Sequence, residues 1–365
     1  MNYNQDELAL IWLDCFDGIS LKKKLDALSY FESPSEFYQK FLDSRDILVP
    51  ILSLPIYEKM ALAHNSQFIS NYVSSLESKD IKVVTIVSKD YSSLLSQIHM
   101  PPLLLYCKGD VSLLNSPCIA MVGTRVCTSY GADMAKKFAK VLCQNGMTIV
   151  SGLATGIDTH SHESTLTHGG KTIGVFAGGF DHIYPSENEN MVKEIVRTGL
   201  IISEYKPNTS NTRYNFPTRN RIIAGLSKGV LIVEASNKSG TMHTKEYAIS
   251  EGRDIFCIPG NITSSASAGT NWLIYSQQAH CVLNPEQILS HYLMEIKTTV
   301  SKPKIEQMDT TEKEILDLLE VEPREYQFLI DKLGIKPNIL TTYLVKMEIA
   351  GKIKKDAGNV YRLSQ

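Results

Sequence analysis

The sequence predicts an α/β protein with a doubly wound sheet at its centre, a helical region before the sheet, and three helices with a hairpin after it. Three observations support this prediction. From residue 80 onward, short apolar runs alternate with stretches of helical spacing, which is the pattern of a parallel sheet covered by helices. Residues 1–77 show helical periodicity and little strand character. Residues 309–365 contain three helical stretches before a hairpin pattern, and the 365-residue chain is long enough for all three parts.

The overall composition excludes several classes of protein. A formal net charge of −2 excludes a uniformly basic nucleic-acid binder, but it allows a local basic groove. The seven cysteines are dispersed and form no C-x-x-C pair, which favours buried, reduced thiols over a disulfide framework or a zinc site. The N-terminus is acidic where a signal peptide is basic, and no apolar run is long enough to span a membrane. We therefore expect a cytoplasmic protein that does not interact with membranes.

Residues 1–77 are expected to form a small helical domain. Apolar side chains at Leu8, Ile11 and Trp12 mark one face of a first amphipathic helix, which Gly18 ends. Two more helices are expected at SLKKKLDALSYF and SPSEFY.

Residues 78–290 are expected to form the domain that contains the doubly wound sheet. From CIAMVG onward its strand candidates are short and apolar without alternation, as strands buried on both faces should be. Ligands of such sheets bind beyond the carboxyl ends of the strands, so the site is sought in those loops. The strand candidates are IKVVTIV, LLLYCKG, CIAMVG, GMTIVSG, KTIGVFAGG, GLIISEY, GVLIVEAS, DIFCIPG and AHCVL.

Residues 291–308 are polar and are expected to be a linker, and residues 309–365 are expected to form a winged helix-turn-helix domain. The hairpin of that domain should turn at Ala357-Gly358-Asn359. Its candidate recognition helix, NILTTYLVKMEI, carries only one lysine and one glutamate. A helix that reads duplex DNA normally has a basic face, so we expect a weak DNA contact or a protein-docking module.

The loop after CIAMVG is the first candidate for an anion contact. Gly123 is followed by Thr124 and Arg125, so a cation stands where a dinucleotide-binding loop needs its second glycine. The next strand ends at Ser151, without the acidic residue that would bind a ribose. Both features argue against a nicotinamide cofactor, and they favour Arg125 as a contact to an anion.

Glycines follow two further strands of the predicted sheet. Gly152 and Gly156 supply backbone flexibility in SGLATGIDTHSHESTL, and Asp158 is expected to cap the following helix. Gly179 belongs to another turn with accessible backbone donors. The histidines of the helix do not have the H-E-x-x-H spacing of a zinc site, and Gly-Lys-Thr at 170–172 lacks the rest of a P-loop. We therefore expect no metal and no nucleoside-triphosphatase activity.

The stretch between Tyr205 and Gly229 contains five cations and no acid. Pro217 suits the first turn of a helix, which would place Arg219 and Arg221 near its positive end. An anion bound there would offset that unfavourable placement. The five cations are Lys206, Arg213, Arg219, Arg221 and Lys228.

Aromatic and hydroxyl groups accompany these cations. Phe216 and Tyr214 could stack on bases, as proteins that bind single strands require. Ser239-Gly240-Thr241 is expected at the start of a helix, where backbone donors bind phosphates well.

Taken in order, these segments resemble the DprA/Smf family, and the resemblance covers most of the chain. It rests on the lead-in DYSSLLSQIHMPPLLLYCKGDVSLLNSPCIAMVGTR and on SGLATGIDTHSHESTL. It also rests on SEYKP, on NFPTRNRIIAGLSKGVLIVEASNKSGT, and on GRDIFCIPGNI followed by GTNWLI. The sequence departs from the family at Thr218, where an aromatic residue is common, and at Met242-His243, where an aliphatic pair is usual.

The resemblance implies an extended Rossmann fold without a catalytic centre, a metal or a cofactor. It implies a homodimer that binds single-stranded DNA in a basic pocket, displaces single-strand binding protein and loads RecA during natural transformation. Arg125, Arg219 and Arg221 would contact phosphates, while glycines and hydroxyls would shape the pocket. The residues expected to bind single-stranded DNA are Gly123, Thr124, Arg125, Gly152, Gly156, Gly179, Phe216, Arg219, Asn220, Arg221, Lys228, Ser239, Gly240 and Thr241.

Two alternatives remain open from the sequence. A nucleotide phosphoribohydrolase or another nucleotide-binding enzyme could use the same loops, with Glu204 and Glu234 at strand ends as acid and base. Against this, EASNKSGT lacks the paired glycines that such enzymes usually have. A transcriptional regulator acting through the C-terminal domain is disfavoured by its weakly charged helix.

Overall fold

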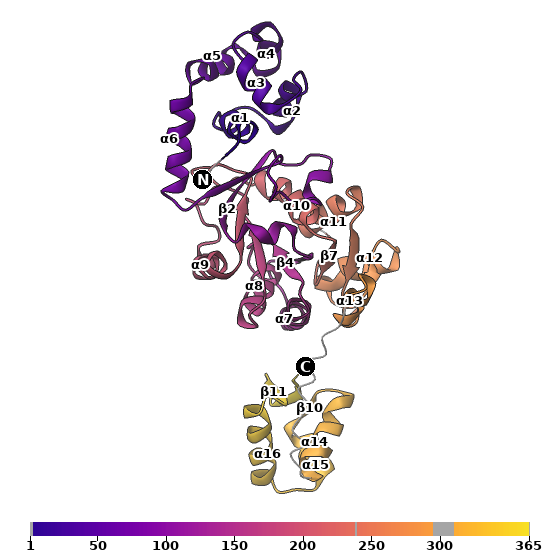
Figure 1. Cartoon of the computed structure of the whole chain (residues 1–365). Coiled ribbons are helices and arrows are strands. Elements are labelled where there is room, and N and C mark those ends of the chain that lie inside the picture. The colour runs from indigo at the N-terminus through magenta and orange to yellow at the C-terminus, as the bar shows by residue number, and fades with distance from the viewer. Residues whose placement is uncertain (1–2, 238, 295–309, 365) are drawn as a thin grey trace. The chain divides into compact units, whose positions relative to one another are not determined.

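The computed structural model describes residues 3–237, 239–294 and 310–364, and the chain forms two compact units, Met1–Lys297 and Thr298–Gln365 (Figure 1). Among the described helices, none is both long and apolar enough to cross a membrane. All seven cysteines carry free thiols, and six of them are buried or half-buried, as expected. Cys281 is the exception because its side chain is exposed.

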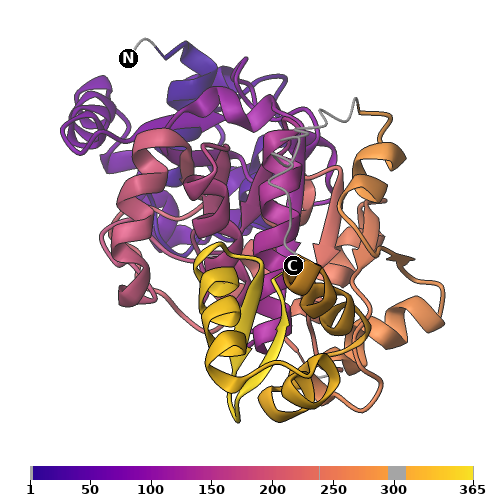
Figure 2. The ribbon, with the colours of Figure 1, turned by 90° about the horizontal axis from the view of Figure 1, so that it is seen from below.

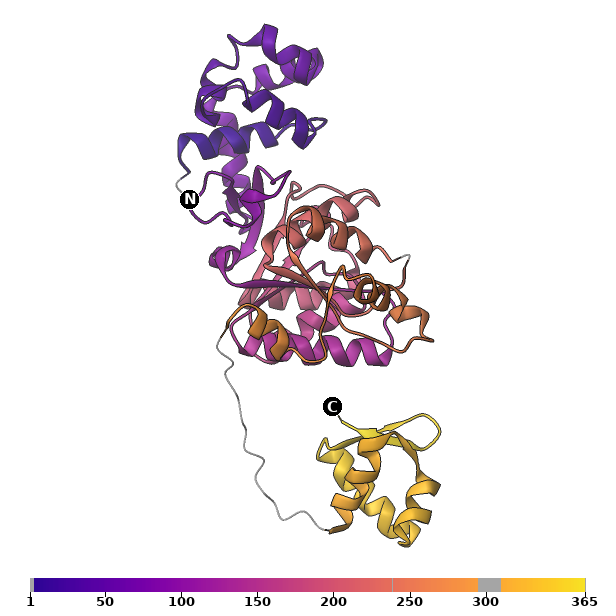
Figure 3. The same cartoon turned by 90° about the vertical axis from the view of Figure 1, so that its right-hand side faces the viewer.

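The first unit begins with six helices, which Figure 3 shows gathered in indigo and purple at one end of that unit. They pack around Trp12, whose indole is fully buried among the rings of Phe37, Phe41 and His64. The indole N–H donates to the Ala63 carbonyl at 3.0 Å. The helices are α1 (Gln5–Asp14), α2 (Leu21–Leu28), α3 (Pro34–Lys40), α4 (Arg45–Leu52), α5 (Leu54–Leu62) and α6 (Ser66–Glu77).

A nine-stranded sheet follows, in the order β1-β2-β6-β5-β4-β3-β7-β8-β9. The seven strands from β6 to β9 in this order are parallel, whereas β1 and β2 are antiparallel additions beside β6. Every predicted apolar run contains one strand. The strands are β1 (Lys82–Thr85), β2 (Leu104–Gly109), β3 (Cys118–Val122), β4 (Thr148–Ser151), β5 (Thr172–Val175), β6 (Leu200–Ser203), β7 (Gly229–Ile232), β8 (Asp254–Cys257) and β9 (His280–Cys281).

Helices cover both faces of the sheet, so the prediction of a doubly wound α/β arrangement is confirmed (Figure 1). One face carries α7 (Ser129–Gln144), α8 (Ile157–Thr167), α9 (Glu189–Thr198) and α13 (Glu286–His291). Figure 2, seen from below, looks onto α7, α8 and α9. The other face carries α10 (Asn215–Leu226), α11 (Thr241–Ser250) and α12 (Ala268–Tyr275).

The first residues of the expected linker at 291–308 belong to the packed fold of the first unit. His291 is the last residue of α13, and the Tyr292 hydroxyl donates to the Asp254 carboxylate at 2.9 Å. Residues 295–308 lie outside the described residues.

The described part of the second unit contains three helices and a three-stranded antiparallel sheet. Its helices are α14 (Thr310–Val321), α15 (Tyr326–Leu333) and α16 (Pro337–Ile349). The sheet has the order β10-β12-β11, with β11 (Ile353–Asp356) and β12 (Val360–Leu363) forming the predicted hairpin. The short strand β10 (Arg324–Glu325) was not expected, because its two charged residues carry no strand pattern.

Candidate nucleic-acid interface

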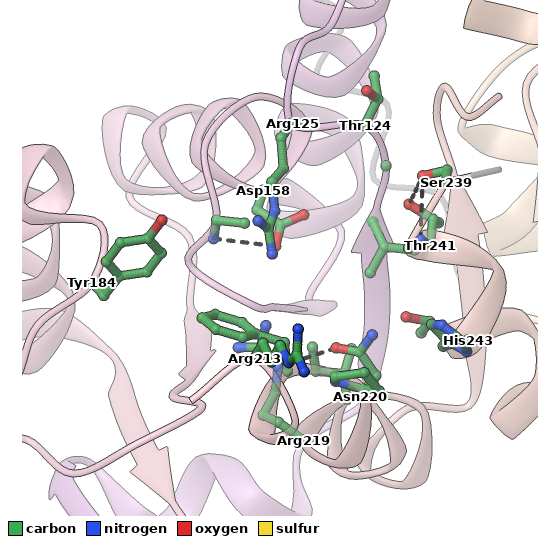
Figure 4. Close-up of a pocket in the computed structure, with 18 of the residues that line it drawn as sticks. Thr124, Arg125, Asp158, Tyr184, Arg213, Arg219, Asn220, Ser239, Thr241 and His243 are labelled. Carbon is green, nitrogen blue, oxygen red and sulfur yellow. Dashed lines mark hydrogen bonds between the residues drawn. The ribbon is translucent and has the colours of Figure 1, made fainter. Parts of the chain in front are cut away.

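A cavity of about 750 Å³ lies beyond the carboxyl ends of β3 and β7, where the strand order reverses direction. Loops after five strands, the start of α8 and parts of α10 and α11 surround it (Figure 4). The fold therefore brings together segments from residue 122 to residue 244. Nine of the residues expected to bind DNA line it, namely Gly123, Thr124, Arg125, Phe216, Arg219, Asn220, Ser239, Gly240 and Thr241.

Arg125 presents its guanidinium to the cavity from the loop between β3 and α7. The guanidinium carbon lies 5.3 Å from the centre of the Phe216 ring, and the Arg125 side chain is exposed. The loop is held because the Thr124 N–H donates to the Glu234 carbonyl at 2.8 Å. No carboxylate among the described residues forms an ion pair with Arg125, so its charge is available to an anion.

Gly156 lets two of the loops pack closely together. Its φ is +79°, and an added Cβ would lie 2.4 Å from the Thr124 carbonyl oxygen and 2.6 Å from that of Arg125. Any other residue would push the Arg125 loop away from the start of α8. Gly156 thus shapes the cavity without lining it.

Arg219 lines the cavity, but most of its hydrogen-bond donors are already engaged. Its side chain is only 4% exposed, and Nη1 donates to the carbonyls of Gly152, at 2.7 Å, and of Val175. Nε donates to the Asn220 side chain at 3.2 Å. Arg219 therefore ties α10 to the ends of β4 and β5, and it contributes positive potential more than direct contacts.

The position of Arg219 within α10 differs from the expected one. The helix begins at Asn215, so Pro217 does lie in the first turn, but Arg219 and Arg221 follow in the second turn. The helix dipole acts mainly on the first turn, and its penalty on these two cations is correspondingly small.

Asp158 faces the same space as Arg219, from the second position of α8 rather than from the cap, which is Gly156. Its Oδ2 accepts from the N–H groups of Gly152, at 3.1 Å, and of Ala154, at 3.4 Å. Burial raises the pKa of Asp158 to about 6, although Arg219 and the two N–H donors oppose that rise. A buried acid that titrates near neutrality therefore lies beside the cations.

The Ser239-Gly240-Thr241 turn contributes hydroxyl groups rather than free backbone donors. It stands at the start of α11 as expected, and the Ser239 and Thr241 hydroxyl oxygens lie 2.9 Å apart. However, the Thr241 N–H donates to Ser239 Oγ and the Met242 N–H donates to the Ser239 carbonyl. The expected phosphate site on the helix N-terminus is therefore already occupied by contacts within the turn.

Several residues line the cavity that the sequence did not single out as a site. Arg213 is exposed, and its guanidinium carbon lies 4.8 Å from the centre of the Tyr214 ring. Tyr184 is 55% exposed and meets Phe216 edge-to-face, with ring centres 5.9 Å apart. Arg213 could have been selected because it lies in the acid-free stretch, whereas Tyr184 comes from the β5–α9 connection and had no local pattern to reveal it.

Three predicted site residues lie away from the cavity. Arg221 forms a buried two-oxygen ion pair with Glu204 and lines a second cavity, between the N-terminal helices and the sheet. Lys228 immediately precedes β7, at the opposite end of that strand, and its ammonium lies over the Tyr292 ring. Gly179 packs against the carbonyls of Lys206 and Pro207. Gly152 lies just beneath the cavity, beside Arg219 and Asp158.

Neither glutamate of the enzymatic alternative is free to act as an acid or base. Glu204 is held by Arg221, and Glu234 is 1% exposed. The Glu234 carboxylate accepts from the Thr128 N–H at 2.8 Å and from its hydroxyl at 2.7 Å. Both acids therefore serve the fold, and neither lines the cavity.

Comparison with known proteins gives consistent matches over this part of the chain. Residues 82–293 match the family model described as DNA recombination-mediator protein A. The DNA processing protein DprA of Bacillus subtilis is 40% identical over 217 residues, which are 59% of this chain and 73% of that protein.

Two solved structures also match. DNA processing protein A from Streptococcus pneumoniae superposes with a TM-score of 0.67 at 32% identity, over 81% of this chain and 99% of that one. DNA processing protein A from Helicobacter pylori, described as having a unique single-stranded DNA binding mode, gives 0.54 at 32% identity, over 58% and 95% of the two chains.

Proposed function

Because the chain belongs to the DNA recombination-mediator protein A family, we propose that its cavity beyond β3 and β7 binds single-stranded DNA without sequence preference. The observation that carries this proposal is the pair of exposed guanidiniums, Arg125 and Arg213, on the rim of a cavity also lined by aromatic rings. Exposed cations that lack carboxylate partners bind phosphates without regard to base identity.

The rings supply the second half of the proposed binding mode. Phe216 and Tyr184 line the cavity in edge-to-face contact with one another, and the Arg125 guanidinium lies over Phe216. Bases of any kind can stack on such rings, whereas duplex DNA keeps its bases stacked internally. This combination favours single strands over duplex. Phe216 supplies the aromatic ring that the family commonly has at the position of Thr218.

We further propose that the protein acts as a non-enzymatic mediator in the cytoplasm: a homodimer that protects single strands, displaces single-strand binding protein and loads RecA during natural transformation. Glu204 and Glu234 are both held by hydrogen bonds within the fold, so neither is available as an acid or base. This supports a role without catalysis. The name of the matched family, a recombination mediator, supports the partnership with a recombinase.

We also propose that residues 1–77 form a domain of the SAM or helix–hairpin–helix kind and that residues 309–365 form a winged helix. The order of helices and strands in the second unit supports the latter. On α16 the side chains of Ile339, Val345 and Ile349 are exposed. An apolar helix face with little charge favours docking of a protein over reading of duplex DNA.

The test is fluorescence anisotropy of a labelled oligo-dT at two salt concentrations, with unlabelled duplex of the same length as competitor. We expect tight, salt-sensitive binding that duplex competes poorly. Arg125→Ala should weaken binding and lower the salt slope by about 0.7, because one phosphate contact is lost.

Lys228→Ala is the matched control, because it removes a cation of the same stretch that lies away from the cavity. It should bind oligo-dT like the unmodified chain. An Arg125→Ala variant with an unchanged slope would remove this loop from the interface. Absence of any binding to oligo-dT would refute the proposal as a whole and leave the cavity as a small-molecule site.

A further inference from the structure

A cluster of two histidines and an aspartate lies at the other end of the sheet from the DNA cavity. Asp254 is the first residue of β8, His280 the first of β9, and His291 the last of α13. The carboxylate oxygen and imidazole nitrogens of these three residues all lie within 4.8 Å of one another. The proposed function uses none of them.

The register of the sheet brings the three side chains to one face. His280 pairs with Phe256, two residues along the strand from Asp254, so all three positions share the face that α13 covers. The Phe256 ring centre lies 5.6 Å from that of His280 and 5.2 Å from that of His291. Phe256 itself is buried, and it forms an apolar floor under the cluster.

The separation of the groups suits a tetrahedral ion. His291 Nε2 lies 3.3 Å from Asp254 Oδ2. Ligands bound to zinc at their usual distance are about 3.4 Å apart when the geometry is tetrahedral. His280 is exposed, and its ring centre is 5.1 Å from that of His291, so a small rotation brings it into range.

A further contact orients the carboxylate. The Tyr292 hydroxyl donates to Asp254 Oδ2 at 2.9 Å. Hydrogen bonds of this kind fix the ligand geometry of metal sites. The nearby Lys228 ammonium, 5.4 Å from the Tyr292 ring centre, is exposed and therefore largely screened by solvent.

We propose that Asp254, His280 and His291 bind one Zn²⁺ ion, with water completing the coordination, and that the ion ties the edge strand β9 and helix α13 to β8. Two imidazoles and one carboxylate suit zinc, whereas Mg²⁺ and Ca²⁺ prefer oxygen ligands alone. The strand β9 has only two residues and forms an edge of the sheet, so a cross-link there stabilises a strand that has few ladder hydrogen bonds of its own.

The test uses the full chain without a histidine tag, stripped of metal with a chelator and titrated with Zn²⁺ in a calorimeter. We expect one ion per chain, and a melting temperature raised by saturating Zn²⁺ because the ion binds only the folded state. Co²⁺ should give the visible absorption of a tetrahedral site. His280→Ala and His291→Ala should each abolish the binding, the melting shift and the absorption.

Two controls separate this site from other sources of zinc binding. His160→Ala removes a histidine that also lies near a carboxylate, 3.6 Å from Glu163, but has no third ligand; it should bind normally. Cys281→Ser removes the exposed thiol next to His280 and should also bind normally. Absence of binding, binding that survives both His280→Ala and His291→Ala, or binding lost only in Cys281→Ser would overturn the proposal. None of these outcomes depends on DNA binding.

Discussion

Two cavities of similar size lie in the first unit, and they differ in whether the cations that line them form ion pairs. The DNA cavity, about 750 Å³, has exposed guanidiniums at Arg125 and Arg213. The second cavity, about 830 Å³, lies between the N-terminal helices and the sheet, and three of the four lysines and arginines that line it form ion pairs with acids. In it Arg221 meets Glu204, Lys206 meets Asp17, and Lys24 meets Asp14 at 2.6 Å.

The contrast is sharpest within α10, where Arg219 and Arg221 are two residues apart and face different cavities. Arg221 is neutralised by a carboxylate, whereas Arg219 is held mainly by backbone carbonyls that carry no net charge. The number of cations in a segment therefore does not show how much positive charge it offers to a ligand. The partners of those cations decide that.

The largest effect is expected from breaking the ion pair in the second cavity. Arg221→Ala should lower the free energy of unfolding by about 3 kcal/mol, because it leaves the largely buried Glu204 carboxylate without its partner. Urea denaturation measures this effect. Replacing both residues with apolar ones of similar volume should restore most of the stability. A loss below about 1 kcal/mol for the single variant would show that the pair is solvated.

Removing the ring in the DNA cavity should reduce affinity rather than stability. Phe216→Ala should weaken oligo-dT binding by about 1–3 kcal/mol, because it removes a stacking surface for a base. Tyr275→Ala is the matched control, since this ring is 79% exposed and does not line the cavity. Equal losses in the two variants would contradict the assignment of Phe216, and anisotropy titrations distinguish the cases.

Removing one free cation should have a smaller effect on DNA binding, and removing a paired cation should have none. Arg213→Ala should lower the salt slope of oligo-dT binding by about 0.7 and leave stability within about 0.5 kcal/mol. Lys206→Ala removes a cation from the same acid-free stretch, but one that is already paired with Asp17. Its slope should match that of the unmodified chain. Equal changes in the two variants would mean that pairing does not determine which cations bind DNA.

The smallest effect concerns the pH dependence of DNA binding. With a pKa of about 6, Asp158 is ionised at pH 7 and protonated at pH 5, so acidification removes a negative charge from the cavity. Affinity for oligo-dT should rise by about two- to threefold over that interval. In Asp158→Asn the affinity at pH 7 should match that of the unmodified chain at pH 5. A rise of equal size in Asp158→Asn would contradict the assignment of the pH dependence to Asp158.

The raised pKa of Asp158 also makes the stability of the fold depend on pH. The folded-state pKa of Asp158 is above the ordinary aspartate value of about 3.9, so the unfolded chain binds fewer protons between those two values. This residue therefore lowers stability as the pH rises from about 4 to about 6. The buried His162, whose pKa burial lowers to about 3, acts in the opposite direction and lowers stability as the pH falls below about 6.5.

The local sequence was sufficient to predict the strands of the large sheet and the helices that cover it. Apolar runs without alternation, separated by helical spacing, predicted the nine strands and their helices, because burial on both faces imposes that pattern on any sequence. The rule that ligands bind beyond the carboxyl ends of parallel strands then led to Gly123, Arg125 and the Ser239–Thr241 turn, which all line one cavity.

Only the tertiary structure decided which of the charged residues remain free. Glu204 and Arg221 are 17 residues apart, and Arg219 reaches carbonyls 67 and 44 residues before it, so no local pattern records these contacts. The same holds for Tyr184, which reaches the cavity from the β5–α9 connection, and for Lys228, which the turn before β7 carries to the opposite edge. Periodicity reports which face of an element is buried, whereas the pairing of charges depends on distances through space that only the packed chain sets.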